Sequence, residues 1–356
     1  MSQNNQLNFS NQKFFIGIDV HLKSWKVTIR NNLMELTTFS MNPSPIGLYK
    51  HLNHHYPNGE FYSTYEAGFC GYWIHRELER LGIKNIIIHP ADVPTTDKEK
   101  SNKTDRSDSR KLARELENNA LKSIYIPDEF HQQLRTLNRL RYRQIQNSTR
   151  LKNRIKAHLY MNGINIPGHS ELCHWSGRFI QWLRSLNFTH PQAYDYLHIC
   201  LDEFENCRKR IVNIIRLLRS YTGQTEIKET IRRLCSIPGI GYVTAVTFYS
   251  ELIDIHRFNT LDDLSSYIGL VPSVKSSGDK ELKSGLTYRR NKYLRQLIVE
   301  SAWIAIRKDP ALLEVFNQLT KRMRKQNAII RIARKLLNRI RYVWKNQIDY
   351  SYAIVQ

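Results

Sequence analysis

The amino-acid sequence predicts two kinds of structure in series, an α/β region followed by a mainly helical remainder. Short apolar runs alternate with helical patterns up to about residue 120, whereas helical spacing prevails after residue 128. The chain has 356 residues, of which 41% are hydrophobic, a share that excludes general disorder. No apolar run reaches the roughly 20 residues that span a bilayer, so we expect no membrane partner. We divide the chain into residues 1–127, 128–222 and 223–356.

The first region predicts five strands and three helices. The expected strands cover residues 14–20, 25–29, 33–39, 61–65 and 85–88, and the expected helices cover residues 43–56, 71–81 and 105–117. In chain order this is three strands, helix, strand, helix, strand, helix. It is the order of the ribonuclease-H-like fold, in which parallel strands with crossover helices extend three antiparallel strands.

The second region predicts two long helical arms with a break at residues 162–169, where Gly163, Pro167 and Gly168 stand. Such arms form an antiparallel helical hairpin or coiled coil, which would serve dimerisation or contact with nucleic acid.

Charge is unevenly distributed along the chain, whose formal net charge is +22. Residues 131–170 hold eight Lys and Arg and no acid, and residues 315–348 hold ten and no acid. Basic helical faces of this kind favour a polyphosphate backbone, with a solvated basic surface as the alternative. The expected nucleic-acid contacts of the central region are Arg135, Arg139, Arg141, Arg143, Lys152 and Arg154.

The third region opens with a Pro-Gly-x-Gly turn between two predicted helices. This pattern resembles a helix-hairpin-helix element, in which Gly239 and Gly241 would bring backbone N–H groups close to a phosphate. The alternative is a glycine turn that links two core helices.

Four acids of the first region stand where this fold can gather them. Asp19 ends a buried apolar strand, and Glu66 ends the fourth strand. Asp105 and Asp108 share a helix face, with Cβ atoms roughly 5–6 Å apart. A carboxylate at the end of a buried strand is costly unless it is paired or binds a metal ion. Carboxylates suit Mg²⁺, and two such ions can assist phosphoryl transfer.

Several long motifs resemble the DEDD-type insertion-sequence transposases, a family of bridge-RNA-guided serine recombinases related to the pilin-gene invertases. The acid-bearing motifs are FIGIDVHLKSW, TYEAGFCGYWIHREL and NKTDRSDSRKLAREL, and SIPGIGYVTAVTFYSEL, DDLSSYIGLVPSVKSSGDK and NKYLRQLIVESAW follow in the C-terminal part. The resemblance implies a RuvC-like domain in which Asp19, Glu66, Asp105 and Asp108 bind Mg²⁺, with Mn²⁺ as a substitute.

The resemblance also implies a C-terminal transposase domain with a serine nucleophile. That residue is Ser277, with Ser276 as the neighbouring alternative, and the basic residues beside it are Arg289, Arg290, Lys292 and Arg295. Many family members have glycine before the Asn of the following motif, where this chain has Arg290.

Partners and compartment follow from the same resemblance and from the cysteines. The family implies a bridge RNA, donor and target double-stranded DNA, and a homodimer that assembles into a homotetramer. Five irregularly spaced cysteines indicate a reducing cytoplasm, here that of a bacterium with the protein at the nucleoid. We expect a DNA transposase that forms a phosphoserine intermediate. The alternatives are a RuvC-like nuclease that uses water, and a non-catalytic RNA-binding module.

Overall fold

A computed structural model of the chain describes residues 8–94, 105–223, 225–277 and 280–352. The side chains of residues 105–107, 225 and 274–284 lie outside this description. The chain divides into two compact units, residues 1–126 and residues 127–356, which are described separately below. The second unit contains both the predicted helical arms and the predicted C-terminal region.

The first unit is built on one five-stranded sheet with the order β3-β2-β1-β4-β5. Its strands are β1 (Lys13–Val20), β2 (Trp25–Asn31), β3 (Met34–Met41), β4 (Glu60–Glu66) and β5 (Lys84–Ile88). The strands β1, β2 and β3 pair antiparallel, whereas β4 and β5 extend the sheet in parallel from β1. The prediction of three antiparallel strands extended by parallel strands is therefore confirmed, and the sheet is consistent with a RuvC-like domain.

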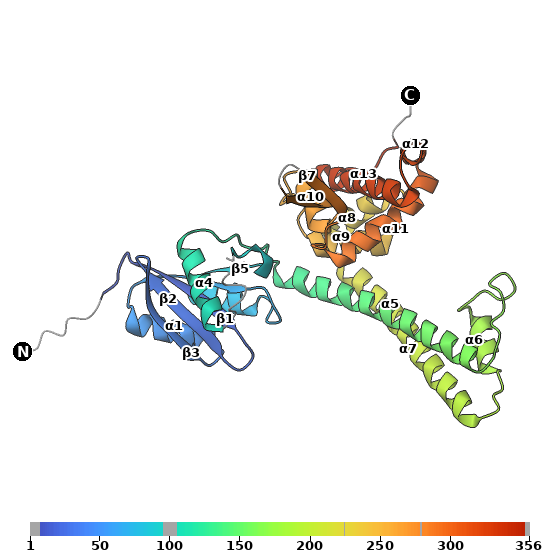
Figure 1. Ribbon diagram of the computed structural model, residues 1–356, viewed down its shortest axis with the longest axis horizontal. Coiled ribbons are helices and arrows are strands. Elements are labelled where there is room, and N and C mark those ends of the chain that lie inside the picture. The colour runs from blue at the N-terminus through green and yellow to red at the C-terminus, as the bar shows by residue number, and fades with distance from the viewer. Residues whose placement is uncertain (1–7, 95–104, 224, 278–279, 353–356) are drawn as a thin grey trace, which may run out of the picture. The chain divides into compact units, whose positions relative to one another are not determined.

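Helices cover both faces of this sheet (Figure 1). They are α1 (Pro45–His55), α2 (Trp73–Arg80), the short 3₁₀ helix η1 (Pro90–Asp92) and α4 (Asp105–Glu117). Phe14, Ile16 and Ile18 of β1 share a core with residues of α1 and α2. Side chains alternate along a strand, so the intervening residue Gly17 faces the other way, where α4 packs.

The second unit begins with a long helical hairpin. Its helices are α5 (Glu129–Met161), α6 (Gly177–Arg184) and α7 (Pro191–Tyr221). Asp128 caps α5 by accepting a hydrogen bond from the backbone N–H of His131 at 2.8 Å. A local core that includes Ile155, Leu159 and Leu201 joins α5 to α7, and α6 packs at the distal end (Figure 1). This confirms the predicted antiparallel arms and their break.

The remainder of the second unit is helical apart from one hairpin. Its elements are α8 (Thr225–Cys235), α9 (Tyr242–Leu252), α10 (Leu261–Ile268), β6 (Pro272–Ser277), β7 (Lys280–Leu286), α11 (Lys292–Lys308), α12 (Pro310–Thr320) and α13 (Lys325–Asn346). A large apolar core joins these helices, and Leu134 of α5 and Leu218 of α7 belong to it. The base of the helical hairpin and the C-terminal helices therefore fold around one core.

The hairpin of β6 and β7 is a finding that the sequence did not predict. The segment around Ser276 and Ser277 is rich in Lys, Ser and Gly, which is typical of a loop, but Val274 and Leu282 lie within paired strands. Among the described helices, none is both long and apolar enough to cross a membrane.

Candidate functional site: a carboxylate edge and a basic helix

Two of the predicted metal ligands end neighbouring parallel strands at the same edge of the sheet. Ile18 of β1 pairs with Tyr65 of β4, so Asp19 and Glu66 occupy the next register position on each strand. Gly17 of β1 pairs with Thr64 of β4, and the Cβ position of Gly17 faces α4. Asp19 and Glu66 follow this pair by two residues on their strands, so their side chains are directed to the same face. Asp19 and Glu66 therefore share one face and one edge.

Helix α4 lies against this face because Gly17 has no side chain. A Cβ atom on Gly17 would stand 2.1 Å from the carbonyl oxygen of Ser109 and 2.5 Å from the amide nitrogen of Ala113. The buried hydroxyls of Thr28 and Ser109 are 2.9 Å apart and join β2 to the same helix. Glycine at position 17 is therefore required by the close approach of helix and sheet.

The direction of α4 brings its first turn toward the carboxylates. At its far end, Glu117 accepts hydrogen bonds at 2.7 Å from the Nε of Arg30 and from the backbone N–H of Leu33. Arg30 is paired with Phe15, near the start of β1, so α4 runs antiparallel to β1. Half-buried Asp108 consequently lies at the end of α4 that is directed toward Asp19. Asp105 begins the helix, and its side chain lies outside the description.

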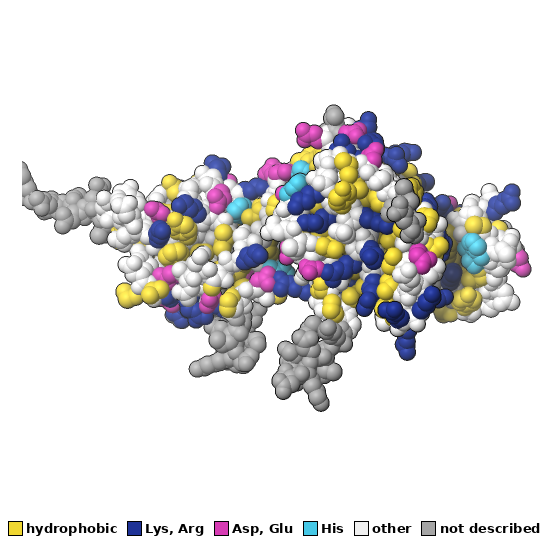
Figure 2. Space-filling model, turned by 90° about the horizontal axis from the view of Figure 1, so that it is seen from above, with side chains coloured by type: hydrophobic (Ala, Val, Ile, Leu, Met, Phe, Trp, Pro, Cys, Tyr) yellow, Lys and Arg dark blue, Asp and Glu magenta, His cyan; other side chains and the backbone are white. Residues whose placement is uncertain are grey.

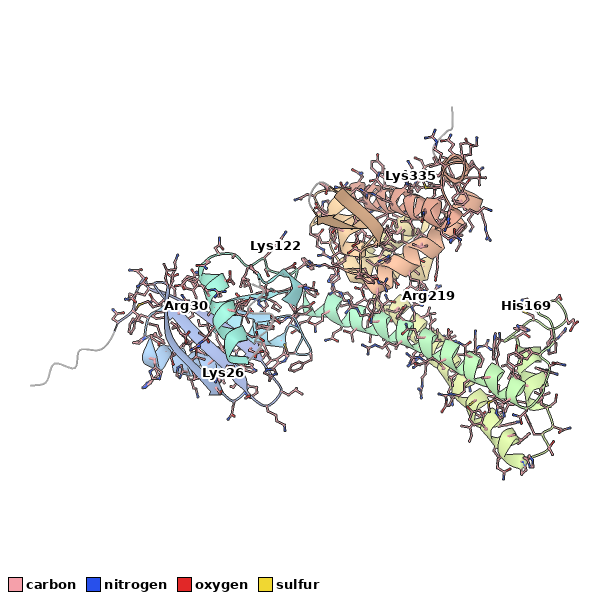
Figure 3. The ribbon with its side chains drawn as sticks, in the orientation of Figure 1. Lys26, Arg30, Lys122, His169, Arg219 and Lys335 are labelled. Atoms are coloured by element: carbon pink, nitrogen blue, oxygen red, sulfur yellow. The ribbon has the colours of Figure 1, made fainter. Side chains whose placement is uncertain are left out.

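The neighbours of Asp19 are basic. The Oδ2 of Asp19 is 3.1 Å from the Nε2 of His21, and the Asp19 side chain is 20% exposed. Lys26 is the register partner of Asp19 on β2 and donates to Ser40 at 3.0 Å. Figure 3 labels Lys26 and Arg30 on this strand. Basic side chains beside the edge suit an anionic substrate.

The donors at this edge fit a hard divalent cation. Carboxylate oxygens from two strand ends and one helix are the ligands that Mg²⁺ prefers. Within the ranges that the structure describes, no three His, Cys, Asp or Glu side chains are close enough to hold an ion as they stand. The set that we expect has a fourth member, Asp105, whose side chain is not among those described.

The predicted serine lies in the other unit. Ser277 ends β6, where it pairs with Lys280, and Ser276 pairs with Glu281. The hairpin is fixed at its base, since the N–H of Thr287 donates to the carbonyl of Val271 at 3.0 Å. The serine side chains and residues 278–279 lie outside the description, so the role of Ser277 stays a prediction.

A buried network that the sequence did not predict holds the segment after this hairpin. The side chain of Glu251 on α9 is 0% exposed and accepts from the Nε and Nη2 of Arg139 at 2.7 and 2.8 Å. It also accepts at 2.9 Å from the side-chain amide of Asn291, which caps α11. The signal in the sequence was a lone acid in the otherwise apolar segment YVTAVTFYSEL.

Packing within the second unit engages three of the predicted nucleic-acid contacts. Arg135 is 8% exposed and donates to the carbonyls of Ser250 and Glu251, at the end of α9. The Arg139 side chain pairs with the Glu251 carboxylate and stays 37% exposed, and Arg141 is buried. The predicted contacts do not all face solvent, because α5 packs against α9 on one side.

The predicted glycine turn has a packing role at Gly239. Gly239 has φ +88°, and a Cβ there would meet the carbonyl oxygen of Ser301 at 2.5 Å. Gly239 is therefore required for the close packing of this turn against α11, and its predicted phosphate contact stays a prediction. Gly241 precedes α9 and is exposed, with open space where a Cβ would stand, so its predicted phosphate contact stays a prediction.

The other predicted contacts are more accessible. Arg143 and Arg154 are exposed on α5, and Arg154 lies 3.6 Å from Glu203. Lys152 is half-buried over the ring of Trp175, and burial together with nearby Arg208 lowers the pKa of its ammonium. The exposed or half-buried residues near the β6–β7 hairpin are Arg289, Arg290, Lys292 and Arg295.

The second acid-free stretch is partly neutralised by acids from elsewhere in the chain. Arg334 pairs with Asp262, and Arg339 pairs with Asp309. Arg341 donates to the backbone carbonyl of Asn259 at 2.5 Å. Figure 2 shows Lys and Arg side chains spread over the visible face among apolar and acidic ones. Some of the positive charge of the two acid-free stretches is therefore neutralised within the protein and is not available to a partner.

Two comparisons with known families agree with this architecture, a carboxylate-edged sheet followed by a helical unit. The chain matches a DEDD transposase family, described as "Transposase", over residues 16–161. It also matches the "Transposase IS116/IS110/IS902 family" over residues 231–317. The two ranges together cover more than half of the chain.

Similar proteins carry transposase names. The y4qE protein of Sinorhizobium fredii is 29% identical over 242 residues, which are 68% of this chain and 58% of that protein. The "Transposase for insertion sequence element IS1111A" of Coxiella burnetii is 29% identical over 68% of this chain and 64% of its own length. The "Transposase for insertion sequence element IS1328" of Yersinia enterocolitica is 26% identical over 65% of this chain. The chain thus spans less than two thirds of the length of the first two relatives.

The fold and the family matches define the class of protein as a DEDD transposase. The chain belongs to the IS110/IS116 family of insertion-sequence transposases. The motifs of the sequence also predict membership of a family of serine recombinases. That assignment is wrong, because the matching family is one of DEDD transposases. A DEDD transposase domain implies the use of a divalent metal ion, which agrees with the donor chemistry of the carboxylate edge.

Proposed function

We propose that this protein cuts and rejoins DNA strands to move an insertion sequence, guided by an RNA. The observation that carries the proposal is the shared edge of Asp19 and Glu66, with the first turn of α4 and Asp108 directed toward it. Phosphoryl transfer is catalysed largely by positioning and by charge stabilisation, which such an edge can supply.

The carboxylates and the serine have separate roles in this mechanism. Asp19, Glu66, Asp105 and Asp108 would hold Mg²⁺, which supplies charge neutralisation at the scissile phosphate when bound. The hydroxyl oxygen of Ser277 forms a bond to phosphorus and loses its proton, while the bond from phosphorus to the leaving strand breaks and that strand's oxygen gains a proton. The resulting phosphoserine keeps the strand activated for rejoining without a nucleotide cofactor.

His21 and Lys26 support the carboxylate edge. His21 lies 3.1 Å from the Asp19 carboxylate and orients it, as a hydrogen-bonded partner orients a metal ligand. Lys26 adds a positive charge across the strand pair from Asp19. Both residues are positioning residues in this account.

The guide and the assembly are further parts of the proposal. Exposed Arg143 and Arg154 on α5, together with the basic residues after β7, offer positive charge to a guide RNA and to DNA. The acids and Ser277 belong to different compact units, an arrangement that suits a site completed by two subunits of a dimer or tetramer. Sequence choice would then rest on pairing between the guide and DNA.

A RuvC-like nuclease is the alternative function, because the same carboxylates can activate water. The two functions separate in one experiment with purified protein, Mg²⁺, RNA transcribed from the element's flanking DNA, and labelled junction DNA. We expect a protein–DNA adduct on a denaturing gel from wild type and from Ser276→Ala, and none from Ser277→Ala. Cleavage without an adduct, equal in wild type and Ser277→Ala, would establish the nuclease and contradict the transposase mechanism.

A further inference from the structure

Arg139 and Arg141 stand two residues apart on α5 and have opposite electrostatic surroundings. The Nε and Nη2 of Arg139 donate to the two oxygens of the Glu251 carboxylate. Burial alone would lower the pKa of the Arg139 guanidinium, but this pairing raises it. Arg141 is only 6% exposed and has no ion-pair partner among the described residues. Burial lowers its pKa, and no neighbouring carboxylate opposes that effect. A buried cation without a counter-ion is costly, so Arg141 calls for an explanation.

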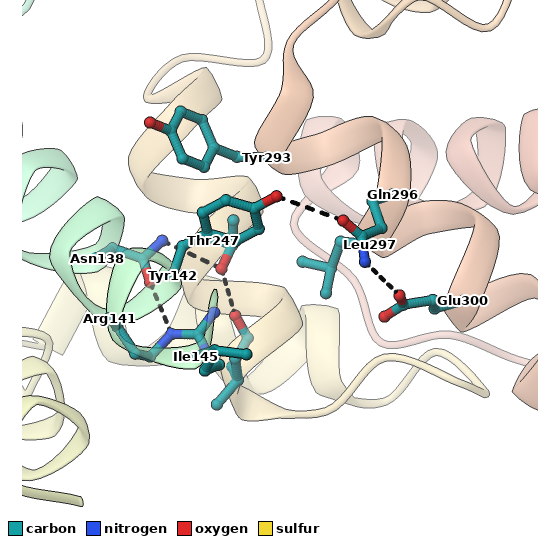
Figure 4. A pocket seen from close by; sticks show the side chains of 10 residues that line it. Asn138, Arg141, Tyr142, Ile145, Thr247, Tyr293, Gln296, Leu297 and Glu300 are labelled. Carbon is teal, nitrogen blue, oxygen red and sulfur yellow. Dashed lines mark hydrogen bonds between the residues drawn. The ribbon is translucent and has the colours of Figure 1, made fainter. Parts of the chain in front are cut away.

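A cavity of about 240 Å³ adjoins Arg141 (Figure 4). It lies between α5, α9 and α11, and its lining includes Asn138, Tyr142, Thr247, Tyr293 and Gln296. Most of the polar groups of the wall are already used. The Asn138 amide donates to Thr247 and Ser250 at 3.1 Å, and the Tyr142 hydroxyl donates to Gln296.

The guanidinium of Arg141 is the cationic group of this lining with donors to spare. Its Nε donates to the Asn138 oxygen at 3.3 Å, whereas Nη1 and Nη2 donate to no group within the described part of the chain. Asn138 thereby holds the planar group in place. Two parallel N–H donors on one guanidinium match two oxygens of a phosphate.

The single acid of the lining does not neutralise Arg141. Glu300 is exposed and accepts a hydrogen bond from the Gln296 amide at 2.8 Å. The aromatic rings of Tyr142 and Tyr293 meet edge to face at a centroid distance of 5.0 Å and provide an apolar wall. The cavity therefore combines a phosphate-matched cation with apolar surface suited to a sugar or a base.

We propose that the Arg141 cavity binds a phosphate ester, with the guanidinium paired to the phosphate and the ester group against the tyrosines. The phosphate belongs either to a nucleic-acid strand or to a free nucleotide, which share this chemistry. The site lies wholly within the second unit, so its test does not depend on DNA cleavage or on the carboxylate edge.

Thermal unfolding of the full chain tests the site, with inorganic phosphate exchanged for chloride at constant ionic strength. Arg141→Met removes the guanidinium, and Arg150→Met is the matched control at an exposed position of the same helix. We expect phosphate to raise the Tm of wild type and Arg150→Met saturably, with at least about tenfold weaker binding in Arg141→Met. An equal rise in all three proteins would show an adventitious ion only and would overturn the proposal.

A second pair of variants covers the case in which Arg141→Met does not fold. Glu300→Gln removes the negative charge from the lining and is expected to bind phosphate more tightly than wild type. Arg141→Lys keeps the charge but loses the fork, and is expected to bind more weakly. Unchanged phosphate affinity in both variants would overturn the proposal.

Two more probes separate the sources of the phosphate. Adenosine 5′-monophosphate and a single-stranded tetranucleotide are titrated into wild type and Arg141→Met. Arg141-dependent stabilisation by the tetranucleotide indicates a strand, whereas stabilisation by the mononucleotide alone indicates a free nucleotide. If neither ligand acts through Arg141, the site is not a phosphate-ester site.

Discussion

The carboxylate edge of the first unit could be predicted from the sequence, whereas the environments of the arginines on helix α5 of the second unit could not. At the edge, Asp19 and Glu66 come together because parallel strands end side by side and side chains alternate with a period of two. On α5, residues only two or four apart have unrelated environments, because α9 covers one side of the helix and brings Glu251 to it. Local periodicity predicts a site made by one sheet, whereas charge counts fail where a distant acid neutralises them.

The largest expected effect tests whether α4 depends on Gly17 for its place at the edge. In Gly17→Ala the new Cβ would overlap the backbone of Ser109 and Ala113, so α4 must shift. We expect a loss of roughly 3 kcal/mol in the free energy of unfolding, measured in urea. Gly177→Ala is the control, since nothing lies within 4 Å of its Cβ position, and it should change stability by less than about 0.5 kcal/mol. Equally small changes in the free energy of unfolding in both variants would contradict the close packing of α4 on Gly17.

The next prediction concerns the acid that neutralises α5. Glu251→Gln leaves Arg139 without its carboxylate and weakens the bond to Asn291, at an expected cost of about 3 kcal/mol. Glu229→Gln removes the exposed partner of Arg232 and should cost no more than about 0.5 kcal/mol. A double-mutant cycle with Arg139→Met measures the coupling, and a coupling near zero would refute the account of this network.

Acid titration examines a second distant pair, Arg339 with Asp309. Burial would raise the pKa of Asp309, but hydrogen bonds from Tyr350 and the N–H of Leu312, together with Arg339, outweigh it and lower the pKa below the ordinary value of 3.8. A lowered pKa in the folded state stabilises the protein above the unfolded-state pKa, and this contribution is lost as pH falls further. The stability gap between wild type and Asp309→Asn should therefore be constant above about pH 5 and should narrow below about pH 4.

Unfolding measured from pH 3 to pH 7 checks this prediction. Asp195→Asn, at an exposed position of α7, serves as the control for general effects of charge removal. A gap between wild type and Asp309→Asn that widens toward low pH would contradict the assigned direction.

The smallest expected effects separate surface arginines from structural ones on α5. Arg143→Ala should weaken binding to a polyanionic ligand such as RNA, with little change in stability. It should also reduce the slope of log affinity against log salt by about 0.7–0.9. Arg135→Met should leave that slope unchanged and destabilise the fold, because Arg135 donates to the carbonyls at the end of α9. If the two variants exchange these behaviours, the division of α5 into a buried and an exposed side is wrong.

Much of the first unit could be predicted because its elements have strong local signals. The apolar run before Asp19 and the alternation in β2 indicate strands, and Gly82 indicates the end of α2. The β6–β7 hairpin could not be predicted in this way, since its stability comes from cross-strand pairs and from the anchoring of Thr287 and Asn291. The burial of Arg135 likewise depends on contacts more than a hundred residues away in the chain.

The central claim is that Asp19, Glu66 and the first turn of α4 form one metal-binding edge, and affinity cleavage tests it most directly. Full-length protein is loaded with Fe²⁺ in place of Mg²⁺, treated with ascorbate and peroxide, and the sites of backbone cleavage are mapped by mass spectrometry. We expect cuts near residues 19, 66 and 105–108, competed by Mg²⁺ and abolished in Asp19→Asn. Cuts elsewhere, or cuts that persist in Asp19→Asn, would contradict the claim.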